Sequence, residues 1–486
     1  MNAFIETREV DLVVIGAGPV GENVADRAVQ GGLETVIVER ELVGGECSYW
    51  ACEPSKALLR PAHVLELARA TPGVSEAITG RLDVEAVLQR RDESTSDWSD
   101  TAQVRWLETA GIALLRGHGR LTGERTVSVE LPDGGTVVLR ARHAVAVATG
   151  STARIPDIPG LADSTPWTNR EATAVRTLPR HLAIIGGGVV ATEMATAYRA
   201  LGTEVTVIAR GELLGGMERF AAEAVTEALE NVGATVLART ATQGVERRGD
   251  EYVIRTSAGT IVADRLLVAA GRAPATGDLG LESIGLTPGE WLRTDDTLVV
   301  RGTDWLYAVG DVNGRALLTH QGKYQARAAG DAIAARATGA ALDDGPWGAH
   351  VATADHTAVP QVVFTAPEVA AVGRTADDAR AAGLNIRVVD YDLGWVAGAA
   401  LSRTGYRGRA RMVVDDDRQV IVGATFVGPD VAELIQTATT AIVGEVPLSR
   451  LWHAVPAFPT VSEIWLRLLE TYGRSQSSTS RTGAPS

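Results

Sequence analysis

A glycine-rich pattern occurs twice in this chain and restricts its fold more than any other feature of the sequence. Residues 11–40 read DLVVIGAGPVGENVADRAVQGGLETVIVER, and residues 181–210 read HLAIIGGGVVATEMATAYRALGTEVTVIAR. The two stretches align without a gap at an offset of 170 residues. Each runs from an apolar strand through a Gly-x-Gly-x-x-Gly/Ala turn into a helix and a second strand, the order of a dinucleotide-binding unit. One copy is weak evidence, but two copies in this context predict two dinucleotide sites.

Length and pattern together predict an α/β protein of several domains. At roughly 100–200 residues per domain, the 486 residues allow about three domains. Strand and helix patterns alternate in the first part of the chain, as in a doubly wound sheet. Near residue 346 the pattern changes, and the following stretch reads as a separate α+β domain. Residues 473–486 are polar and poor in apolar side chains, which predicts a disordered tail.

Charge and hydrophobicity exclude several classes of function. The net charge of −14 argues against a nucleic-acid groove and against binding to an anionic membrane surface. No apolar run approaches the roughly 18 residues that span a bilayer, and the first ten residues lack the pattern of a signal peptide. We therefore predict a cytoplasmic protein with no membrane or nucleic-acid partner. In that compartment, a close pair of cysteines indicates metal binding or redox chemistry more often than a structural disulfide.

The first glycine-rich turn has the residues that a dinucleotide needs. Gly16 allows a tight turn, Gly18 lets the backbone approach a pyrophosphate, and Gly21 lets the helix pack closely on its strand. Glu39 ends the second strand, where a carboxylate can accept hydrogen bonds from both hydroxyls of a ribose. The predicted site also includes two neighbours of these residues, Pro19 and Arg40.

The second turn differs at the position that selects the coenzyme. Gly186 and Gly188 fill the glycine positions. The internal alignment puts Ala209 opposite Glu39, so a carboxylate that would repel the 2′-phosphate of NADP is missing. The next residue, Arg210, can pair with that phosphate. We therefore predict NADPH as the coenzyme, with NADH as the alternative.

The only two cysteines of the chain, Cys47 and Cys52, lie in the segment GGECSYWACEPSK. In a regular helix, residues five apart have Cα atoms about 8.6 Å distant, farther than the roughly 7 Å that a disulfide allows. A bridge therefore needs a distorted segment before a helix that starts near Pro54, which leaves Cys52 at a helix N-terminus that favours thiolate. The other reading is two buried thiols that never bond. Two cysteines with no His cluster nearby make a poor zinc site, and we predict no metal site.

Lysine occurs only twice in the chain, and one of the two, Lys56, follows Cys52 by four residues. An ammonium group is either required beside the thiols or placed there by chance.

The order Cys47-x4-Cys52 followed by Pro54-Ser55-Lys56, between two dinucleotide units, resembles the pyridine nucleotide-disulfide oxidoreductases. That family includes dihydrolipoamide dehydrogenase, glutathione reductase and mercuric reductase. The resemblance covers about residues 8–472 and implies an FAD domain in two parts, an inserted NAD(P) domain and an interface domain that forms a homodimer. The implied bounds are 1–155 and 277–345 for the FAD domain, 156–276 for the NAD(P) domain and 346–472 for the interface domain.

The resemblance also implies roles for individual residues. Cys47 resembles the thiol that meets the substrate, and Cys52 resembles the thiol that lies against the flavin. Lys56 resembles the family lysine beside the flavin N5, and Glu193 the glutamate paired with it. Further residues resemble the family's FAD contacts, with the last on the ribityl chain: Gly45, His118, Gly119, Thr149, Gly150, Ser151, Gly310 and Asp311. Residues that resemble the segments near the nicotinamide nucleotide are Val189, Gly271 and Arg272.

The chain departs from the family at the C-terminal motif. Disulfide reductases of the family carry His-Pro-Thr-x-Ser-Glu, in which the His is a general acid/base presented across the dimer and held by the Glu. Here Phe458 stands in the His position, whereas Glu463 is present. A positioned acid/base contributes roughly 10²–10⁴ in rate, which argues against ordinary dithiol–disulfide exchange. His453 either replaces it or is an ordinary structural residue.

These observations predict an FAD enzyme that takes hydride from NADPH, reduces the Cys47–Cys52 pair and passes electrons to a small-molecule acceptor such as a quinone. Two alternatives stay open. One is a reductase of a specific disulfide, of the dihydrolipoamide dehydrogenase type, that uses another acid. The other is a flavin-bound thiol redox sensor. Mercuric reduction is disfavoured because that enzyme uses additional C-terminal cysteines, and this chain has no others.

Overall fold

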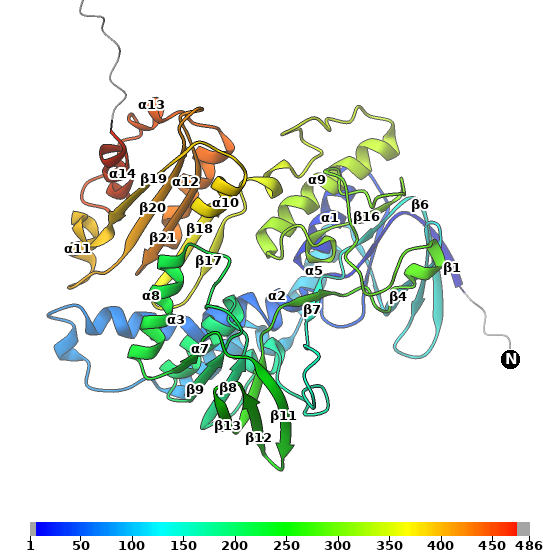
Figure 1. The fold of residues 1–486 in the computed structure, drawn as a ribbon. Coiled ribbons are helices and arrows are strands. Elements are labelled where there is room, and N and C mark those ends of the chain that lie inside the picture. Colours follow the sequence, from blue (N-terminus) through cyan, green and yellow to red (C-terminus); the bar gives the residue numbers. More distant parts are fainter. Residues whose placement is uncertain (1–5, 474–486) are drawn as a thin grey trace, which may run out of the picture. The chain divides into compact units, whose positions relative to one another are not determined.

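The structure is a computed structural model that describes residues 6–473, and it confirms the predicted α/β class with an α+β part at the C-terminal end (Figure 1). The chain divides into two compact units, which we describe separately. The first unit consists of residues 1–65, 80–215 and 226–359, and the second of residues 66–79, 216–225 and 360–486. Of the predicted disordered tail, only Gly473 lies within the described residues. The domain bounds drawn from the sequence stay predictions.

The main sheet of the first unit has seven strands, and its five parallel strands, β1, β2, β3, β6 and β16, end together at one edge. Its order is β3-β2-β1-β6-β5-β4, with β16 paired to β6. The strands are β1 (Glu6–Ile15), β2 (Thr35–Glu39), β3 (Ala113–Arg116), β4 (His118–Gly123), β5 (Thr126–Glu130), β6 (Thr136–Val147) and β16 (Leu306–Ala308). The parallel registers Ile15–Val38, Ile15–Val147 and Ala308–Val147 put the carboxyl ends of β1, β2, β6 and β16 side by side. Open α/β sheets bind their ligands at this edge.

Alternate side chains bury β1 on both of its faces, as expected for a parallel strand covered by other elements. Leu12 and Val14 pack into a cluster with helices α1 (Pro19–Gln30) and α9 (Thr319–Thr338). Val13 and Ile15 pack into a second cluster on the opposite face, with side chains of β4, β5 and β6. Helices α1 and α9 lie against each other (Figure 1). This packing fixes the start of α1 next to the carboxyl edge of the sheet.

The second glycine-rich copy builds a smaller parallel sheet in the same unit. Its order is β10-β9-β8-β14, formed by β8 (His181–Ile185), β9 (Glu204–Ile208), β10 (Thr235–Leu237) and β14 (Arg265–Val268). Helix α7 (Val189–Ala200) follows β8 as α1 follows β1. Two further sheets are antiparallel: β11 (Thr242–Arg248), β12 (Glu251–Thr256) and β13 (Gly259–Ala263) form one, and β7 (Ser151–Ala153) and β15 (Arg272–Pro274) form the other. The repeat in the sequence is therefore a repeat in the structure.

The second unit is built on a five-stranded antiparallel sheet. Its order is β17-β18-β21-β20-β19, formed by β17 (Gln361–Val363), β18 (Glu368–Gly373), β19 (Ile386–Asp392), β20 (Arg409–Asp415) and β21 (Val420–Gly428). Helix α12 (Ile435–Val443) packs on β18 and β21, and α14 (Ile464–Tyr472) packs on β19 and β20. Among the described residues, the remaining α-helices, apart from those at the candidate site, are α4 (Val84–Ser94), α5 (Thr101–Thr109), α6 (Asn169–Thr173), α8 (Arg219–Asn231), α10 (Ala376–Ala381), α11 (Ala397–Ser402) and α13 (Leu448–Leu451).

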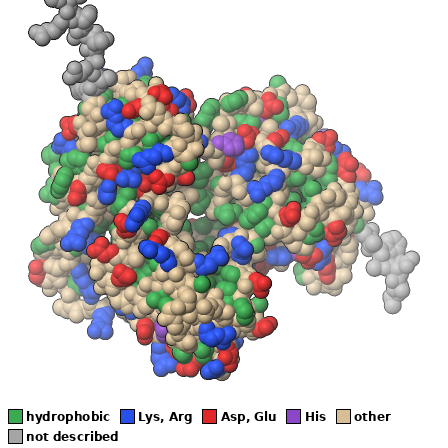
Figure 2. All heavy atoms as spheres, viewed as in Figure 1, with side chains coloured by type: hydrophobic (Ala, Val, Ile, Leu, Met, Phe, Trp, Pro, Cys, Tyr) green, Lys and Arg blue, Asp and Glu red, His purple; other side chains and the backbone are tan. Residues whose placement is uncertain are grey.

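Acidic and basic side chains are interspersed on the face of the molecule that Figure 2 shows. The described residues also form ion pairs, such as Arg27–Asp331 and Arg142–Asp11. Among residues 6–473, no helix is long and apolar enough to cross a membrane. The cytoplasmic location stays a prediction.

Candidate active site

The two cysteines lie on consecutive helices as free, half-buried thiols. Cys47 is in α2 (Gly45–Tyr49), and Cys52 is the first residue of α3 (Cys52–Arg69). The helical path breaks between them at Trp50, which supplies the distortion that their spacing requires. Helix α3 starts two residues earlier than predicted, because Pro54 is tolerated within the first turn. Cys52 therefore stands at a helix N-terminus, as the sequence indicates.

Thr319, the first residue of α9, contacts both sulfur atoms. Its Oγ1 donates a hydrogen bond to Cys47 Sγ at 3.3 Å and lies 3.3 Å from Cys52 Sγ, where either atom can be the donor. A hydrogen bond with Cys47 is the main reason why the pKa of the Cys52 thiol is lowered, and Thr319 and the ammonium of Lys56 add to this effect. The same hydrogen bond, together with burial, raises the pKa of Cys47. Cys52 therefore ionises before Cys47.

Lys56 of α3 forms an ion pair with Glu193 of α7. Its Nζ donates to Glu193 Oε2 at 2.8 Å and to Ser55 Oγ at 3.3 Å. The side chain of Glu193 is only 4% exposed, so its charge depends on partners inside the protein. The pair connects the helix of the thiols to the helix of the second glycine-rich copy.

The first glycine-rich turn and the start of α2 pack so closely on neighbouring backbone that side chains would collide with it. Gly16 adopts a φ of +102°, and a Cβ on it would lie 2.6 Å from Ala148 O. Gly45 adopts a φ of +56°, and a Cβ on it would lie 2.9 Å from Gly18 Cα. Gly18 is the N-cap of α1, and no described side chain caps this helix. The backbone N–H groups of its first turn are therefore available to an anion.

Three polar side chains follow the strand ends at the carboxyl edge of the main sheet. Glu39, at the end of β2, accepts two backbone N–H groups at 2.7 Å each. Thr149, after β6, has a buried hydroxyl with no hydrogen-bond partner among the described residues. Asp311, after β16, accepts a hydrogen bond from Ser151 Oγ at 2.5 Å, and burial raises its pKa. Thr149 and Asp311 thus have hydrogen-bonding capacity left for a ligand.

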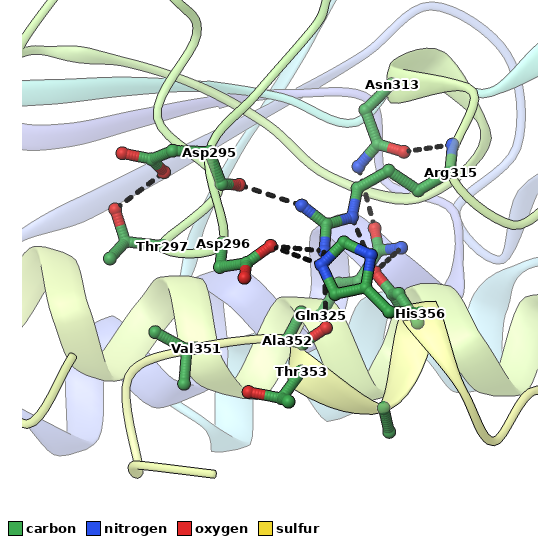
Figure 3. A network of polar contacts seen from close by, with 12 residues as sticks. Asp295, Asp296, Thr297, Asn313, Arg315, Gln325, Val351, Ala352, Thr353 and His356 are labelled. Atoms are coloured by element: carbon green, nitrogen blue, oxygen red, sulfur yellow. Dashed lines mark hydrogen bonds and ion pairs between the residues drawn. The ribbon is translucent and has the colours of Figure 1, made fainter. Parts of the chain in front are cut away.

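A polar network supports the turn Gly310–Asn313, which carries Asp311, and Figure 3 shows its members Asn313, Arg315 and Gln325. Gln325 of α9 accepts hydrogen bonds from the backbone N–H that begins this turn and from Asn313 Nδ2, both at 2.8 Å. Its amide donates to Asp355 at 2.9 Å, and Arg315 donates to the same carboxylate at 2.8 Å. The side chain of Asp355 is 1% exposed, so the network is shielded from solvent and rigidly supports the turn.

Arg272 connects the carboxyl edge to the helix of Cys47. Its guanidinium donates to Ser151 Oγ at 2.9 Å, to Ser151 O at 2.5 Å and to Asn169 Oδ1 at 3.1 Å. The guanidinium also lies 3.6 Å from the carboxylate of Glu46, the residue before Cys47.

The second glycine-rich turn has two arginines beside its coenzyme-selecting position. Ala209 follows β9 and is buried, and its Cβ would lie 2.9 Å from a Cβ placed on Gly187. Arg210 is exposed. The backbone of Arg239, after β10, donates to Gly211 O at 3.1 Å, which brings a second arginine to the same corner. The side chain of Arg239 is 78% exposed.

Comparison with known proteins decides the family. The model of the pyridine nucleotide-disulphide oxidoreductases matches residues 10–334, and the model of the dimerisation domain of these enzymes matches residues 359–468. The chain belongs to this family. A mercuric reductase of Acidithiobacillus ferrooxidans is 32% identical over 96% of this chain and 83% of its own length. A dihydrolipoyl dehydrogenase of Chlorobaculum tepidum is 33% identical over 94% of this chain and 95% of its own length.

Solved structures show the same fold. The Cu(II) complex of the HOCl-induced flavoprotein disulfide reductase RclA from Escherichia coli has a TM-score of 0.81 over 95% of this chain and 99% of that chain. At 23% identity, this likeness concerns the fold alone.

As a pyridine nucleotide-disulphide oxidoreductase, the protein is an enzyme that uses FAD and NAD(P)H, and its dimerisation domain indicates a homodimer. The residues at the carboxyl edge of the main sheet fit FAD. The uncapped start of α1 offers backbone N–H groups to a pyrophosphate, and Thr149 and Asp311 have unused hydrogen-bonding capacity. When bound, FAD supplies a carrier of two electrons between a nicotinamide and the thiols.

The other residues predicted to contact the cofactors of this oxidoreductase occupy turns, strand positions and helix starts. The ring of His118 is hydrogen-bonded to Asp278 O at 3.1 Å, and Gly119 lies within β4. Arg40 is exposed. The remaining ones are Pro19 and Val189 at the starts of α1 and α7, Gly188 as the N-cap of α7, and Gly150, Gly186, Gly271 and Gly310 at positive φ. Their roles toward FAD and NAD(P)H stay predictions.

The C-terminal motif of the oxidoreductase lies in the second unit. The ring of Phe458 is 75% exposed, and His453 is also exposed. Glu463 is buried and accepts a hydrogen bond from Arg467 at 2.5 Å, whereas its Oε2 has no hydrogen-bond partner among the described residues. An imidazole could donate a hydrogen bond to this oxygen, but Phe458 has no donor to offer.

Two residues of the site escaped the sequence analysis. Thr319 is 272 residues away from Cys47 in sequence, and no local pattern marks it. Arg239 had a usable signal, because the segment TVLAR reads as a third parallel strand followed by an arginine at the same edge as Arg210.

Proposed function

We propose that this oxidoreductase takes hydride from NADPH and uses it, by way of FAD, to reduce the Cys47–Cys52 pair. The dithiol then reduces an acceptor that needs no proton from residue 458, and a quinone is the class of acceptor that we favour. Cys47, the thiol with the raised pKa, meets the acceptor, and Cys52 lies toward the flavin. Lys56, paired with Glu193, lies beside the flavin. The enzyme acts in the cytoplasm.

The proposal rests on the presence of Phe458 at the position of the family's acid/base histidine. Reduction of a disulfide substrate releases a thiolate that must be protonated, and a phenyl ring has no proton to exchange. Reduction of a quinone gives a product whose oxygens can take protons from water. An apolar, exposed ring at position 458 therefore suits a flat apolar acceptor better than a disulfide.

A comparison of acceptors tests the proposal directly. The FAD-loaded enzyme is supplied with NADPH and, in separate assays, a naphthoquinone, lipoamide, glutathione disulfide, Hg²⁺ or Cu²⁺. We expect kcat/KM for the quinone to exceed that for either disulfide by about 10²-fold, the lower end of what an acid/base contributes. Faster turnover with a disulfide or a metal ion would contradict the proposal. Turnover with none of them would favour the redox-sensor alternative.

The coenzyme preference gives a second prediction. The native enzyme is expected to use NADPH with a kcat/KM about tenfold or more above that for NADH, because the exposed Arg210 offers a cation to the 2′-phosphate. Arg239 pairs with Glu212 through its Nε at 2.6 Å, and its outer N–H groups can add a weaker contact. The double variant Ala209→Glu/Arg210→Ala should reverse this order, since it restores the repelling carboxylate and removes one cation. Steady-state kinetics with both coenzymes measures the ratio.

A matched control uses an arginine at the opposite edge of the same sheet. Arg180 lies just before β8, is 87% exposed and pairs with Asp264, so Arg180→Ala should leave the ratio unchanged. Equal use of NADPH and NADH by the native enzyme would overturn the argument from the missing carboxylate.

A further inference from the structure

The hydroxyl of Thr319 lies within hydrogen-bond distance of two sulfur atoms but has only one proton to donate. Both of its contacts, to Cys47 Sγ and to Cys52 Sγ, measure 3.3 Å. A hydroxyl has one proton to donate and two lone pairs to accept with. It can therefore donate to only one sulfur at a time. Each thiol also shifts the pKa of the other, which is raised for Cys47 and lowered for Cys52, so the three groups interact with one another.

The surroundings of this group favour one negative charge and oppose two. Cys52 begins α3 and Thr319 begins α9, so two helix N-termini meet at the sulfurs, and Lys56 adds a positive charge. Glu53 on α3 opposes ionisation of both thiols, and Glu193 neutralises part of the charge of Lys56. Half-buried sulfurs this close together cannot both ionise at moderate cost.

We propose that Thr319 is a positioning residue that gives its proton to whichever sulfur carries the negative charge. When Cys52 is the thiolate, Thr319 donates to Cys52. The negative charge moves to Cys47 by proton transfer: the Cys47 S–H bond breaks, and the proton forms a new S–H bond with Cys52 Sγ. The Thr319 hydroxyl then turns toward Cys47 and donates its hydrogen bond there. One proton changes place, and no electrons are transferred. Cys47 becomes the nucleophilic thiolate without an outside base.

This inference deepens the proposed function and rests on it only in taking the two thiols as the redox pair. The imidazole that would generate a thiolate in other members is absent, because Phe458 occupies its position. In the proposed arrangement, the Cys52 thiolate is the base that takes the proton of Cys47, and Thr319 stabilises the thiolate that results. The negative charge therefore moves between two residues of the same subunit.

Thiol labelling at varied pH tests the role of the hydroxyl. The FAD-loaded protein is reduced, freed of reductant under anaerobic conditions and labelled with iodoacetamide for short times between acid and alkaline pH. Trypsin releases both thiols in the single peptide 41–56, whose fragment ions assign the label to Cys47 or Cys52. The pH midpoint for each thiol is compared among the native protein, Thr319→Val and Thr319→Ser.

In Thr319→Val, the labelling midpoint of Cys52 is expected to rise by roughly one pH unit, because a hydrogen bond to a charged group is lost. Labelling of Cys47 at pH values below the Cys52 midpoint should slow by about tenfold for the same reason. Thr319→Ser keeps the hydroxyl and should match the native protein. Should Val disturb the packing, Thr319→Ala removes the hydroxyl without adding a branched apolar group.

Unchanged midpoints in both Val and Ala variants would overturn the proposal, as would a shift in Thr319→Ser as large as that in Thr319→Val. The labelling does not depend on any acceptor. The two tests are therefore independent. A negative labelling result would not affect the assignment of a quinone as acceptor, and a negative acceptor comparison would not affect the conclusion about Thr319.

Discussion

Cys47→Ser is expected to stop the reduction of acceptors while NADPH still reduces the bound flavin. Serine keeps the size and the contact with Thr319 but cannot enter a disulfide, so the pair can no longer cycle. We expect turnover with a quinone to fall by on the order of 10³-fold or more, as when an enzyme loses its covalent nucleophile. Steady-state turnover and anaerobic single-turnover absorbance of the flavin measure the two steps separately.

Ser48→Ala is the matched control, because it removes a hydroxyl one residue away on the same short helix and should keep full activity. Substantial quinone turnover in Cys47→Ser would show that electrons leave the flavin without passing through the thiols. In that case the cysteine pair would serve the sensor function instead.

Phe458→His is expected to raise the reduction of lipoamide and glutathione disulfide. The buried Oε2 of Glu463 has no hydrogen-bond partner among the described residues and can hold an introduced imidazole. An optimised acid/base contributes roughly 10²–10⁴ in rate, and the gain should stay below that range because the surroundings are not shaped for it. Steady-state kinetics with both disulfides gives the increase.

Two further variants show whether a gain in disulfide reduction comes from the exchangeable proton of the imidazole or from the changed shape of side chain 458. Phe458→Leu, which has no proton to exchange, should give no gain, and Glu463→Gln in the Phe458→His background should lose most of it. Strong native disulfide reduction that Phe458→His leaves unchanged and His453→Ala abolishes would contradict the proposal and make His453 the acid.

The dimer adds a stricter form of this test. In the family arrangement, residue 458 acts on the thiols of the other subunit. A heterodimer of a native chain and a Cys47→Ser/Phe458→His chain should then have one working site with an imidazole, formed by residue 458 of the doubly substituted chain and Cys47 of the native chain. If both residues acted within one subunit, the mixed dimer would show no gain.

The sequence was sufficient for those parts of the site that depend on local pattern. The glycines at positions 16 and 186 had to adopt positive φ between strand and helix, and both do. The spacing of the cysteines required a break in the helix, and the break occurs at Trp50. The resemblance joined Lys56 to Glu193 across 137 positions, and the two side chains form an ion pair.

Contacts set only by packing could not be foreseen. Thr319 reaches the thiols because α9 packs against α1, and nothing within the segment LLTHQGK indicates a hydroxyl between two sulfurs. Similarly, Gln325 and Asp355 support the turn of Asp311 through hydrogen bonds between separate parts of the chain. Such networks depend on angles and distances between elements that a pattern of hydrophobic and polar residues does not record.

The position of Lys56 has a practical consequence for chemical labelling. The chain has two lysines and two cysteines, and three of these four side chains, Cys47, Cys52 and Lys56, lie within ten positions of one another. Lys56 lies one helical turn after Cys52 on α3, with its side chain 37% exposed. Reagents for thiols will therefore react at one place in this molecule, and reagents for amines have only Lys323 of α9 and the terminal amino group as further targets. A single dye attached there would report on cofactor loading and coenzyme binding against an almost silent background.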